Sequence, residues 1–183
     1  VLSVVLGVGR AWLVDRTDLP FAGLWHGVLC ATLAVPAFVN GYAWVSLDRG
    51  VNGFTGAWLV VTLSYYPLVY LPVVAVLRRL DPALEESAWS LGHSRAHSFR
   101  SVVLPQLRPA LLGGALLVGL HLLAEFGALS LLRFPTFTTA IYDQYGSTFN
   151  GSAATAMAGV LVLLCLLLLL AELRLRGNRR YAR

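Results

Sequence analysis

The sequence contains no lysine, and its 14 basic residues are all arginine. This absence excludes two kinds of chemistry. A Walker-type phosphate loop needs a lysine on the nucleotide phosphates, and a Schiff-base enzyme needs a lysine amine. If ATP drives a process in which this chain takes part, another subunit must bind the nucleotide.

Charge of either sign is also scarce, because only 13% of the 183 residues are charged whereas 57% are hydrophobic. An ordinary soluble domain is about one quarter charged. The composition therefore indicates a protein whose solvent is the lipid bilayer. Cys30 and Cys165 lie alone in separate apolar runs, so we expect small buried side chains and no disulfide framework.

Five apolar segments follow one another, at about 1–14, 21–47, 57–77, 107–131 and 153–171. A spanning helix needs about 20 residues, and backbone groups in lipid must be hydrogen-bonded internally. Four of the five segments are therefore long enough to cross the bilayer as helices. We predict an all-α, polytopic transmembrane helix bundle that forms one domain. The short first segment begins on Val1, so we expect it to be a truncated span of a longer chain.

Arginines gather in alternate links between these segments, 11 on one side and two on the other. The larger group comprises Arg16, Arg78, Arg79, Arg95, Arg100, Arg108, Arg174, Arg176, Arg179, Arg180 and Arg183. Basic residues beside membrane spans favour the cytoplasmic side. We therefore predict that 78–108 and the C-terminus are cytoplasmic.

Prolines and small residues within the segments predict how the helices bend and pack. Pro36 interrupts the second segment, and Pro67 and Pro72 interrupt the third, so kinks are expected there. Small residues spaced four apart allow two helices to approach closely. The pairs with this spacing are Gly23 with Gly27 and Ala115 with Gly119.

A polar stretch, EESAWSLGHSRAHSFRSVVLP, interrupts the apolar sequence from Glu85 to Pro105. Asp81 and Pro82 just before it form a helix start, with a carboxylate at the N-cap and proline in the first turn. Gly92 suits a turn or a helix end.

A second helix is predicted from Ser94 to about Val103, with Pro105 as its stop. The result is a helix–Gly–helix elbow on the cytoplasmic face. Residues such as Trp89 and Phe99 are too apolar for a freely solvated loop. We therefore expect one face of the elbow to pack on the bundle and another to meet a partner.

The spacing in this stretch resembles the EAA loop of inner-membrane permeases in binding-protein-dependent ABC importers. Glu86, Ser87 and Ala88 are followed by Gly92 at the family's interval, with serine where alanine is usual. The loop positions carried over are Glu86, Ser87, Ala88, Leu91, Gly92, Phe99, Val102, Leu104 and Pro105.

The resemblance implies that residues 81–105 are a coupling loop that sits in a groove of a separate ATPase subunit, where Glu86 pairs with a basic group. It implies two further partners, a second permease half or subunit and a periplasmic binding protein, in the bacterial inner membrane. The chain would then be a transport subunit and not an enzyme. It would bind no cofactor or nucleic acid, and the partner ATPase would use ATP and Mg²⁺.

Three further stretches, AWLVDRTDLP, SYYPLVYLP and EFGALSLLRFPTFTTAIYDQYG, are similar to the ferric-iron class of these permeases. The tail ELRLRGNRRYAR resembles the link after the first half of a fused, two-half permease. Ferric iron is therefore the expected substrate. Polyamines, sulfate, thiamine and phosphonates are the alternatives, because related permeases carry them.

Two other functional classes remain open from the residues alone. A membrane-embedded enzyme would need a catalytic set inside the spans, but the candidate pair His121 and Glu125 lacks a third member. An ion-driven secondary transporter would not need a cytoplasmic elbow for docking.

Ionisable and polar groups inside the apolar segments are candidates for a translocation path. His121 and Glu125 are four residues apart and share a helix face, although Glu125 could instead pair with Arg133 near the outer interface. Asn40, Tyr65 and Tyr66 lie near prolines and could line a cavity or form interhelical hydrogen bonds. The set is Asn40, Tyr65, Tyr66, His121 and Glu125.

No metal site is predicted. His93 and His97 have the spacing of two helical ligands, but Ser94 stands where a zinc protease has glutamate, and no third ligand is near. Tyr142, Asp143 and Tyr145 offer oxygen atoms that ferric iron prefers. We expect these three residues to form an outer surface for the binding protein rather than an iron site.

Overall fold

The computed structural model describes residues 1–176, in which helices and their connections occur without any strand. This confirms the predicted all-α class. Arg179, Arg180 and Arg183 of the predicted cytoplasmic tail lie outside the described residues. In chain order the elements are α1 (Leu2–Arg16), α2 (Ala22–Ala31), η1 (Thr32–Ala34), α3 (Ala37–Leu47), α4 (Gly53–Tyr65), α5 (Pro67–Leu77), α6 (Pro82–Ser90), α7 (Arg95–Ser98), η2 (Phe99–Val103), α8 (Leu104–Ala124), α9 (Gly127–Leu131), α10 (Phe137–Gly146) and α11 (Gly151–Arg176).

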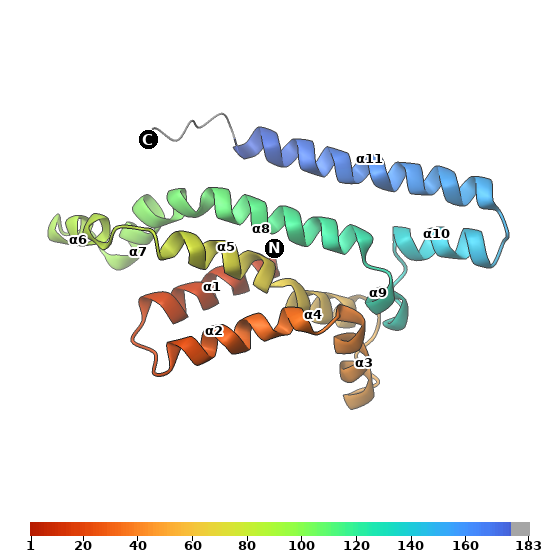
Figure 1. The fold of residues 1–183 in the computed structure, drawn as a ribbon, viewed down its shortest axis with the longest axis horizontal. Coiled ribbons are helices and arrows are strands. Elements are labelled where there is room, and N and C mark those ends of the chain that lie inside the picture. Colours follow the sequence, from red (N-terminus) through yellow and green to blue (C-terminus); the bar gives the residue numbers. More distant parts are fainter. Residues whose placement is uncertain (177–183) are drawn as a thin grey trace.

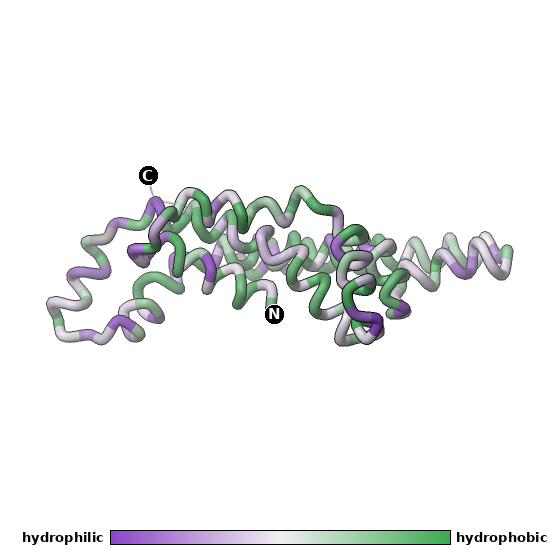
Figure 2. Tube along the Cα trace, turned by 90° about the horizontal axis from the view of Figure 1, so that it is seen from below, coloured by the Kyte–Doolittle hydropathy of each residue, from purple (hydrophilic) through white to green (hydrophobic). Residues whose placement is uncertain are grey.

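The longest helices lie roughly side by side along the long axis of the molecule (Figure 1). Three helices within 1–176 are long and apolar enough to cross a membrane: Gly53–Leu77, Arg95–Ala124 and Gly151–Leu175. Apolar residues predominate along the bundle, and hydrophilic residues gather toward the end that carries α6 and α7 (Figure 2). This distribution fits helices whose middle parts face lipid.

The second apolar segment is not one straight helix. Ala22–Ala34 and Ala37–Leu47 meet at 95°, and together they count as a fourth span only if the bent pair is taken as one. Val35 has an extended backbone, with φ −97° and ψ 116°, as expected for a residue before proline. The ring of Pro36 therefore ends the first part of the segment and opens a new helix at Ala37.

The third segment, where Pro67 and Pro72 predict kinks, forms one candidate span over Gly53–Leu77 that consists of α4 and α5 with Tyr66 between them. Pro67 is the first residue of α5, where a helix does not need a backbone N–H. Tyr66 keeps helical dihedral angles, with φ −57° and ψ −30°, so the chain passes from α4 into α5 without a break of the kind seen at Pro36.

The core lies where α5 packs between α1 and α8. Gly7 of α1 lies against Val69 so closely that an added Cβ would stand 2.9 Å from the Cβ of Val69. A Cβ on Gly114 of α8 would stand 2.8 Å from the Cα of the same residue. By contrast, Gly23 and Gly27 have no neighbour within 4 Å in the described chain, so the predicted close packing does not occur there. α1 and α8 come close to α5 because Gly7 and Gly114 have no side chain to keep the backbones apart.

We call residues 81–105 the elbow. From Asp81 to Ser94 its local structure is as predicted. The Asp81 carboxylate accepts a hydrogen bond from the Ala83 N–H at 3.0 Å and caps α6. Gly92 has φ +82°, in the left-handed region that favours glycine. The Ser94 hydroxyl then caps α7 by accepting from the His97 N–H at 3.3 Å.

The predicted stop at Pro105 is wrong, because Arg95–Ala124 forms one continuous helix of 30 residues. Phe99–Val103 widens into a π-helical turn, and the Leu104 N–H donates to the Phe99 carbonyl. Pro105 follows directly as an early residue of α8. The wide turn shifts the carbonyl register in the turn before the proline ring, so the helix continues where a regular α-turn would clash.

The fourth apolar segment ends as a helix at Ala124 rather than continuing to 131. Glu125 has an extended backbone, with ψ 118°, and the short α9 follows at a new angle (Figure 1). The short helix expected in the outer link is α10, capped reciprocally by Thr136 and Thr139. α11 packs on α8 and α10, but only 6% of its most apolar 18-residue stretch is buried against the rest of the described chain.

Candidate functional site

The elbow presents two different faces. Glu85 and Ala88 are buried, at 7% and 8% exposure. Glu86 and Gly92 are exposed, and the Leu91 side chain is 77% exposed. Glu86 and Leu91 are therefore available to a partner, whereas Glu85 and Ala88 are not.

The other positions of the predicted loop support this arrangement from inside. Phe99 packs edge-on against Trp12 of α1, with ring centroids 4.8 Å apart. Val102, Leu104 and Pro105 are partly buried along the helix into α8. The Ser87 hydroxyl donates to the Ala83 carbonyl at 2.6 Å within α6, so serine in place of alanine needs no partner outside its own helix.

An ion pair that the sequence analysis missed joins α1 to the elbow. Arg16 Nη2 lies 3.2 Å from Glu85 Oε1, and the two side chains are 18% and 9% exposed. The same Nη2 donates to the Leu77 carbonyl at the end of α5, at 3.3 Å. One guanidinium therefore links the ends of α1 and α5 to α6. Because the pair is largely withdrawn from water, loss of one partner would leave an uncompensated buried charge.

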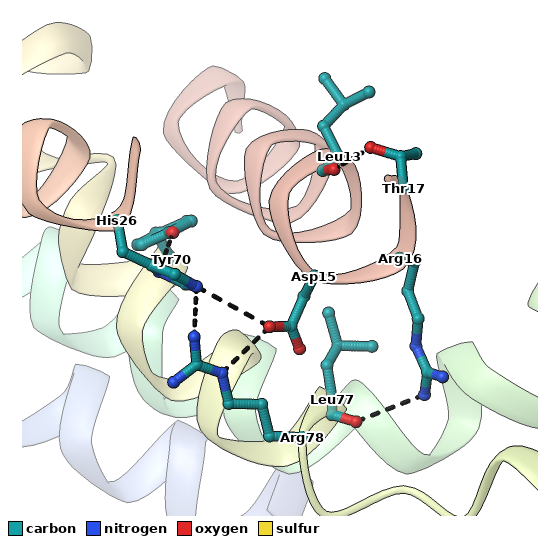
Figure 3. Close-up of polar contacts among 8 residues, drawn as sticks. All are labelled: Leu13, Asp15, Arg16, Thr17, His26, Tyr70, Leu77 and Arg78. Atoms are coloured by element: carbon teal, nitrogen blue, oxygen red, sulfur yellow. Dashed lines mark hydrogen bonds and ion pairs between the residues drawn. The ribbon is translucent and has the colours of Figure 1, made fainter. Parts of the chain in front are cut away.

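A second polar cluster lies on the neighbouring side of α1 (Figure 3). Arg78 Nε donates to Asp15 Oδ1 at 3.0 Å. Arg78 Nη2 also contacts His26 Nε2, and the Tyr70 hydroxyl contacts His26 Nδ1. His26 Nε2 also lies 3.7 Å from Asp15 Oδ1. The cluster ties α1, α2 and α5 together at the elbow end.

The sequence carries some signal for both clusters. Asp15 and Arg16 end the first apolar segment, and Glu85 opens the polar stretch. Ionisable groups at such boundaries need partners when they are buried. The partners themselves could not be assigned, because the choice between Glu85 and the adjacent Glu86 depends on how α6 is rotated about its axis.

A groove of about 1140 Å³ runs between α1 and the elbow. One side is apolar, with Val4 and Val8 of α1 opposite Leu111 of α8, and the Arg16–Glu85 pair lies in its polar part. Away from the Trp12–Phe99 and Arg16–Glu85 contacts, this groove separates α1 from the elbow.

Three of the five predicted path residues come together near the other end of the bundle. The Tyr65 hydroxyl donates to Glu125 Oε2, and the His121 ring lies 5.5 Å from the Tyr65 ring. Glu125 Oε1 accepts from the Ala128 N–H at 2.9 Å, at the start of α9. The alternative pairing of Glu125 with Arg133 is not among the ion pairs of residues 1–176.

The other two path residues lie elsewhere. The Asn40 amide donates to the Ser64 hydroxyl at 2.8 Å, joining α3 to α4. The Tyr66 hydroxyl donates to the Leu29 carbonyl of α2 at 2.9 Å. The Arg10 guanidinium lies 3.9 Å from the Tyr66 ring centroid. Both residues form the interhelical contacts that were the alternative to a cavity lining.

The remaining sequence candidates are exposed. Tyr142, Asp143 and Tyr145 lie on α10, and the Tyr142 ring stands 4.9 Å from the Phe126 ring. His93 and His97 stack with ring centroids 4.4 Å apart. The described part of the chain has no group of three or more His, Cys, Asp or Glu side chains that could hold a metal ion.

The sequence of this chain matches that of a known protein family. Residues 5–176 match the family described as the inner membrane component of binding-protein-dependent transport systems. The chain belongs to this family. The predicted resemblance to its permeases is confirmed, together with the helical permease fold and the multi-pass inner-membrane class.

Two relatives within the permease family show how far the likeness extends. The Fe(3+)-transport system permease protein FbpB 2 of Haemophilus influenzae is 41% identical over 177 residues, which are 97% of this chain and 35% of that protein. The sulfate transport system permease protein CysT of Salmonella typhimurium is 33% identical over 203 residues, covering 98% of this chain and 73% of that protein. The chain thus spans about a third of the length of the first relative.

The permease fold also matches a solved structure, the MetNI methionine ABC transporter in inward-facing conformations. The TM-score is 0.73, and the match covers 96% of this chain and 86% of the other at 18% sequence identity. At this identity the likeness concerns the fold.

Proposed function

We propose that this chain is part of an ABC importer permease in which the elbow docks on a separate ATPase subunit. The exposed Glu86 of α6 and the exposed Leu91 at its end carry the proposal, because they leave a carboxylate and an apolar side chain in solvent for a partner to cover. Arginine is the strongest partner for such a carboxylate. ATP and Mg²⁺ are used by the ATPase, and this chain binds no cofactor.

The elbow end of the bundle faces the cytoplasm in this proposal. The C-terminal ends of α1, α5 and α11 lie at the same end as α6 and α7 (Figure 1). These elements and their flanks carry Arg16, Arg78, Arg79, Arg95 and Arg174. The positive-inside rule supports this orientation. The opposite end, with the exposed Tyr142 and Tyr145 of α10, would then meet the periplasmic binding protein.

Copurification of the full-length permease with its ATPase tests the docking. Burial of a leucine contributes about 2 kcal/mol, so Leu91→Ser should weaken ATPase binding about 30-fold. Leu47→Ser is the matched control, because Leu47 is equally exposed, at 81% against 77%, but lies at the end of α3. Equal ATPase binding by the two variants would contradict docking through the elbow.

Gly92→Asp gives a second test of the elbow. An added Cβ would meet no atom of the chain within 4 Å, but the φ of +82° disfavours a side chain. We expect this variant to separate ATP hydrolysis from transport, because it places a charge and a strained backbone where the ATPase binds. Transport at the normal rate by an assembled Gly92→Asp complex would argue against the docking role.

Ferric iron is the proposed substrate, supported by the 41% identity with FbpB 2 across nearly the whole chain. Sulfate is the second candidate, since CysT is 33% identical over a similar share. Uptake of radiolabelled iron and of radiolabelled sulfate by cells expressing the full-length permease separates the two. Iron uptake that depends on the permease supports the proposal, and uptake of sulfate alone overturns it.

A further inference from the structure

The end of α1 makes two kinds of contact with the elbow, from one helix face. Trp12 and Arg16 are four residues apart, so they project on the same side of α1. The Trp12 ring meets Phe99, 4.8 Å away between centroids. The Arg16 guanidinium meets Glu85, 3.2 Å away. The first contact is apolar and the second is ionic, and both border the groove that otherwise separates α1 from the elbow.

Arg16 is held from a second direction as well. Its Nη2 also donates to the Leu77 carbonyl at 3.3 Å (Figure 3). That carbonyl belongs to the last turn of α5, where helix carbonyls lack partners within the helix and carry negative partial charge. The guanidinium is therefore fixed relative to α5, and Glu85 is fixed relative to both helices.

The neighbouring residue ties α1 to α2 and α5. Asp15 accepts from Arg78 at 3.0 Å, and Arg78 contacts His26 of α2. The last two residues of α1 therefore join the elbow through Glu85 and the helices of the bundle through the contacts drawn in Figure 3. A displacement of α6 that preserves the Arg16–Glu85 pair must move the end of α1 with it.

We propose that the Arg16–Glu85 ion pair transmits movement of the elbow to α1, which makes Glu85 a positioning residue for transport. This inference rests on the proposed docking of an ATPase. It assigns different roles to two adjacent carboxylates: Glu85 holds the elbow to the bundle, and Glu86, which is exposed at the same groove, is left for a partner. Without the pair, α1 would keep its Trp12–Phe99 contact with the elbow but lose the ionic link, so it would follow movement of the elbow less closely.

The test uses the full-length permease reconstituted in proteoliposomes with its ATPase and binding protein. The readout is the amount of substrate transported per ATP hydrolysed, measured together with the amount of ATPase retained. Glu85→Gln keeps the shape of the side chain and removes its charge, so we expect the transport per ATP to fall at least about fivefold with the ATPase still bound. Arg16→Lys keeps the charge and should stay within about twofold of the unmodified protein.

Asp18→Asn is the matched control. Asp18 is an exposed carboxylate that lines the same groove, and it makes no ion pair with the described residues. This variant should keep the normal transport per ATP. A normal ratio in Glu85→Gln with bound ATPase would overturn the inference and leave the docking proposal intact. Failure of the unmodified full-length chain to retain any ATPase would overturn the docking proposal itself.

A chemical cross-link decides the matter if Glu85→Gln does not fold. Arg16→Cys and Glu85→Cys are combined in a chain whose native Cys30 and Cys165 are replaced by alanine. Before cross-linking, the double variant should transport little substrate per ATP hydrolysed. This ratio should recover when a short bis-maleimide joins the two thiols. A cross-linked protein that hydrolyses ATP without regaining transport would contradict a role in transmission.

Discussion

Adjacent residues in this bundle have different neighbours, because successive side chains of an α-helix point about 100° apart. Tyr65 donates to Glu125, whereas Tyr66 donates to the Leu29 carbonyl of α2. Glu85 is buried against Arg16, and Glu86 is exposed. Two adjacent residues of the same type therefore lie in different surroundings.

Glu125 supports a stability prediction at this scale. Glu125→Ala removes the acceptor of the Tyr65 hydroxyl and of the Ala128 N–H. A buried donor left without a partner costs about 1–3 kcal/mol, so the variant should unfold at a lower temperature. Thermal unfolding in detergent measures the effect, with the exposed Asp143→Ala as control. Equal unfolding temperatures for the two variants would show that Glu125 has no structural role.

Some single residues could be assigned from sequence because their partners are local. Asp81 caps the helix that starts beside it, and Gly92 adopts the positive φ that a turn requires. Glu85 could not be assigned, since Arg16 is distant in the chain and the rotation of α6 decides which glutamate meets it. Residues whose role depends on helix rotation need the folded structure.

At the scale of elements, the helix ends predicted from prolines differ most from the structure. Pro36 ends a helix as expected, but Pro105 lies within a continuous one because the Phe99–Val103 turn widens. Sequence patterns carry little information about such a π-turn, which depends on one shifted hydrogen bond. The elbow is therefore continuous with the α8 span, rather than joined to it by a loop.

Helix packing gives a prediction with a control in the same helix. Gly7→Ala places a Cβ 2.9 Å from the Cβ of Val69 and 3.1 Å from the Tyr66 carbonyl oxygen. Overpacking of this kind costs about 1–3 kcal/mol. Gly9→Ala has no neighbour within 4 Å, so it should be neutral or stabilising by up to about 1 kcal/mol through helix propensity. Chemical or thermal unfolding in detergent should rank the variants in that order, and the opposite order would refute the packing of α1 on α5.

At the scale of the whole molecule, composition alone predicts the helical membrane class, because lipid leaves the backbone few alternatives. The way the helices meet depends on contacts between distant residues. Within residues 1–176, a Cβ added to Gly23 or Gly27 of α2 would meet no atom within 4 Å, whereas Gly7 and Gly114 approach α5 closely. Spacing identifies residues that can pack closely, and the tertiary arrangement decides which of them do.

The orientation of the bundle can be tested by labelling. Asp18→Cys and Tyr145→Cys place single thiols at exposed positions near opposite ends, in a chain without Cys30 and Cys165. A membrane-impermeant maleimide should label position 145 in intact spheroplasts and position 18 only after permeabilisation. The reverse pattern would invert the proposed topology. Labelling at both positions in intact spheroplasts would contradict a bundle that separates them by the membrane.

The division between Glu85 and Glu86 affects how relatives of this chain should be aligned. A gap moved across two identical letters leaves an alignment score unchanged. In the molecule, the same shift exchanges a buried ion pair for an exposed charge. A single-residue deletion upstream in α6 would bring the second glutamate toward Arg16 and remove the first from it. Alignments of this stretch are therefore better anchored on Asp81 and Gly92, whose backbone geometry fixes their positions.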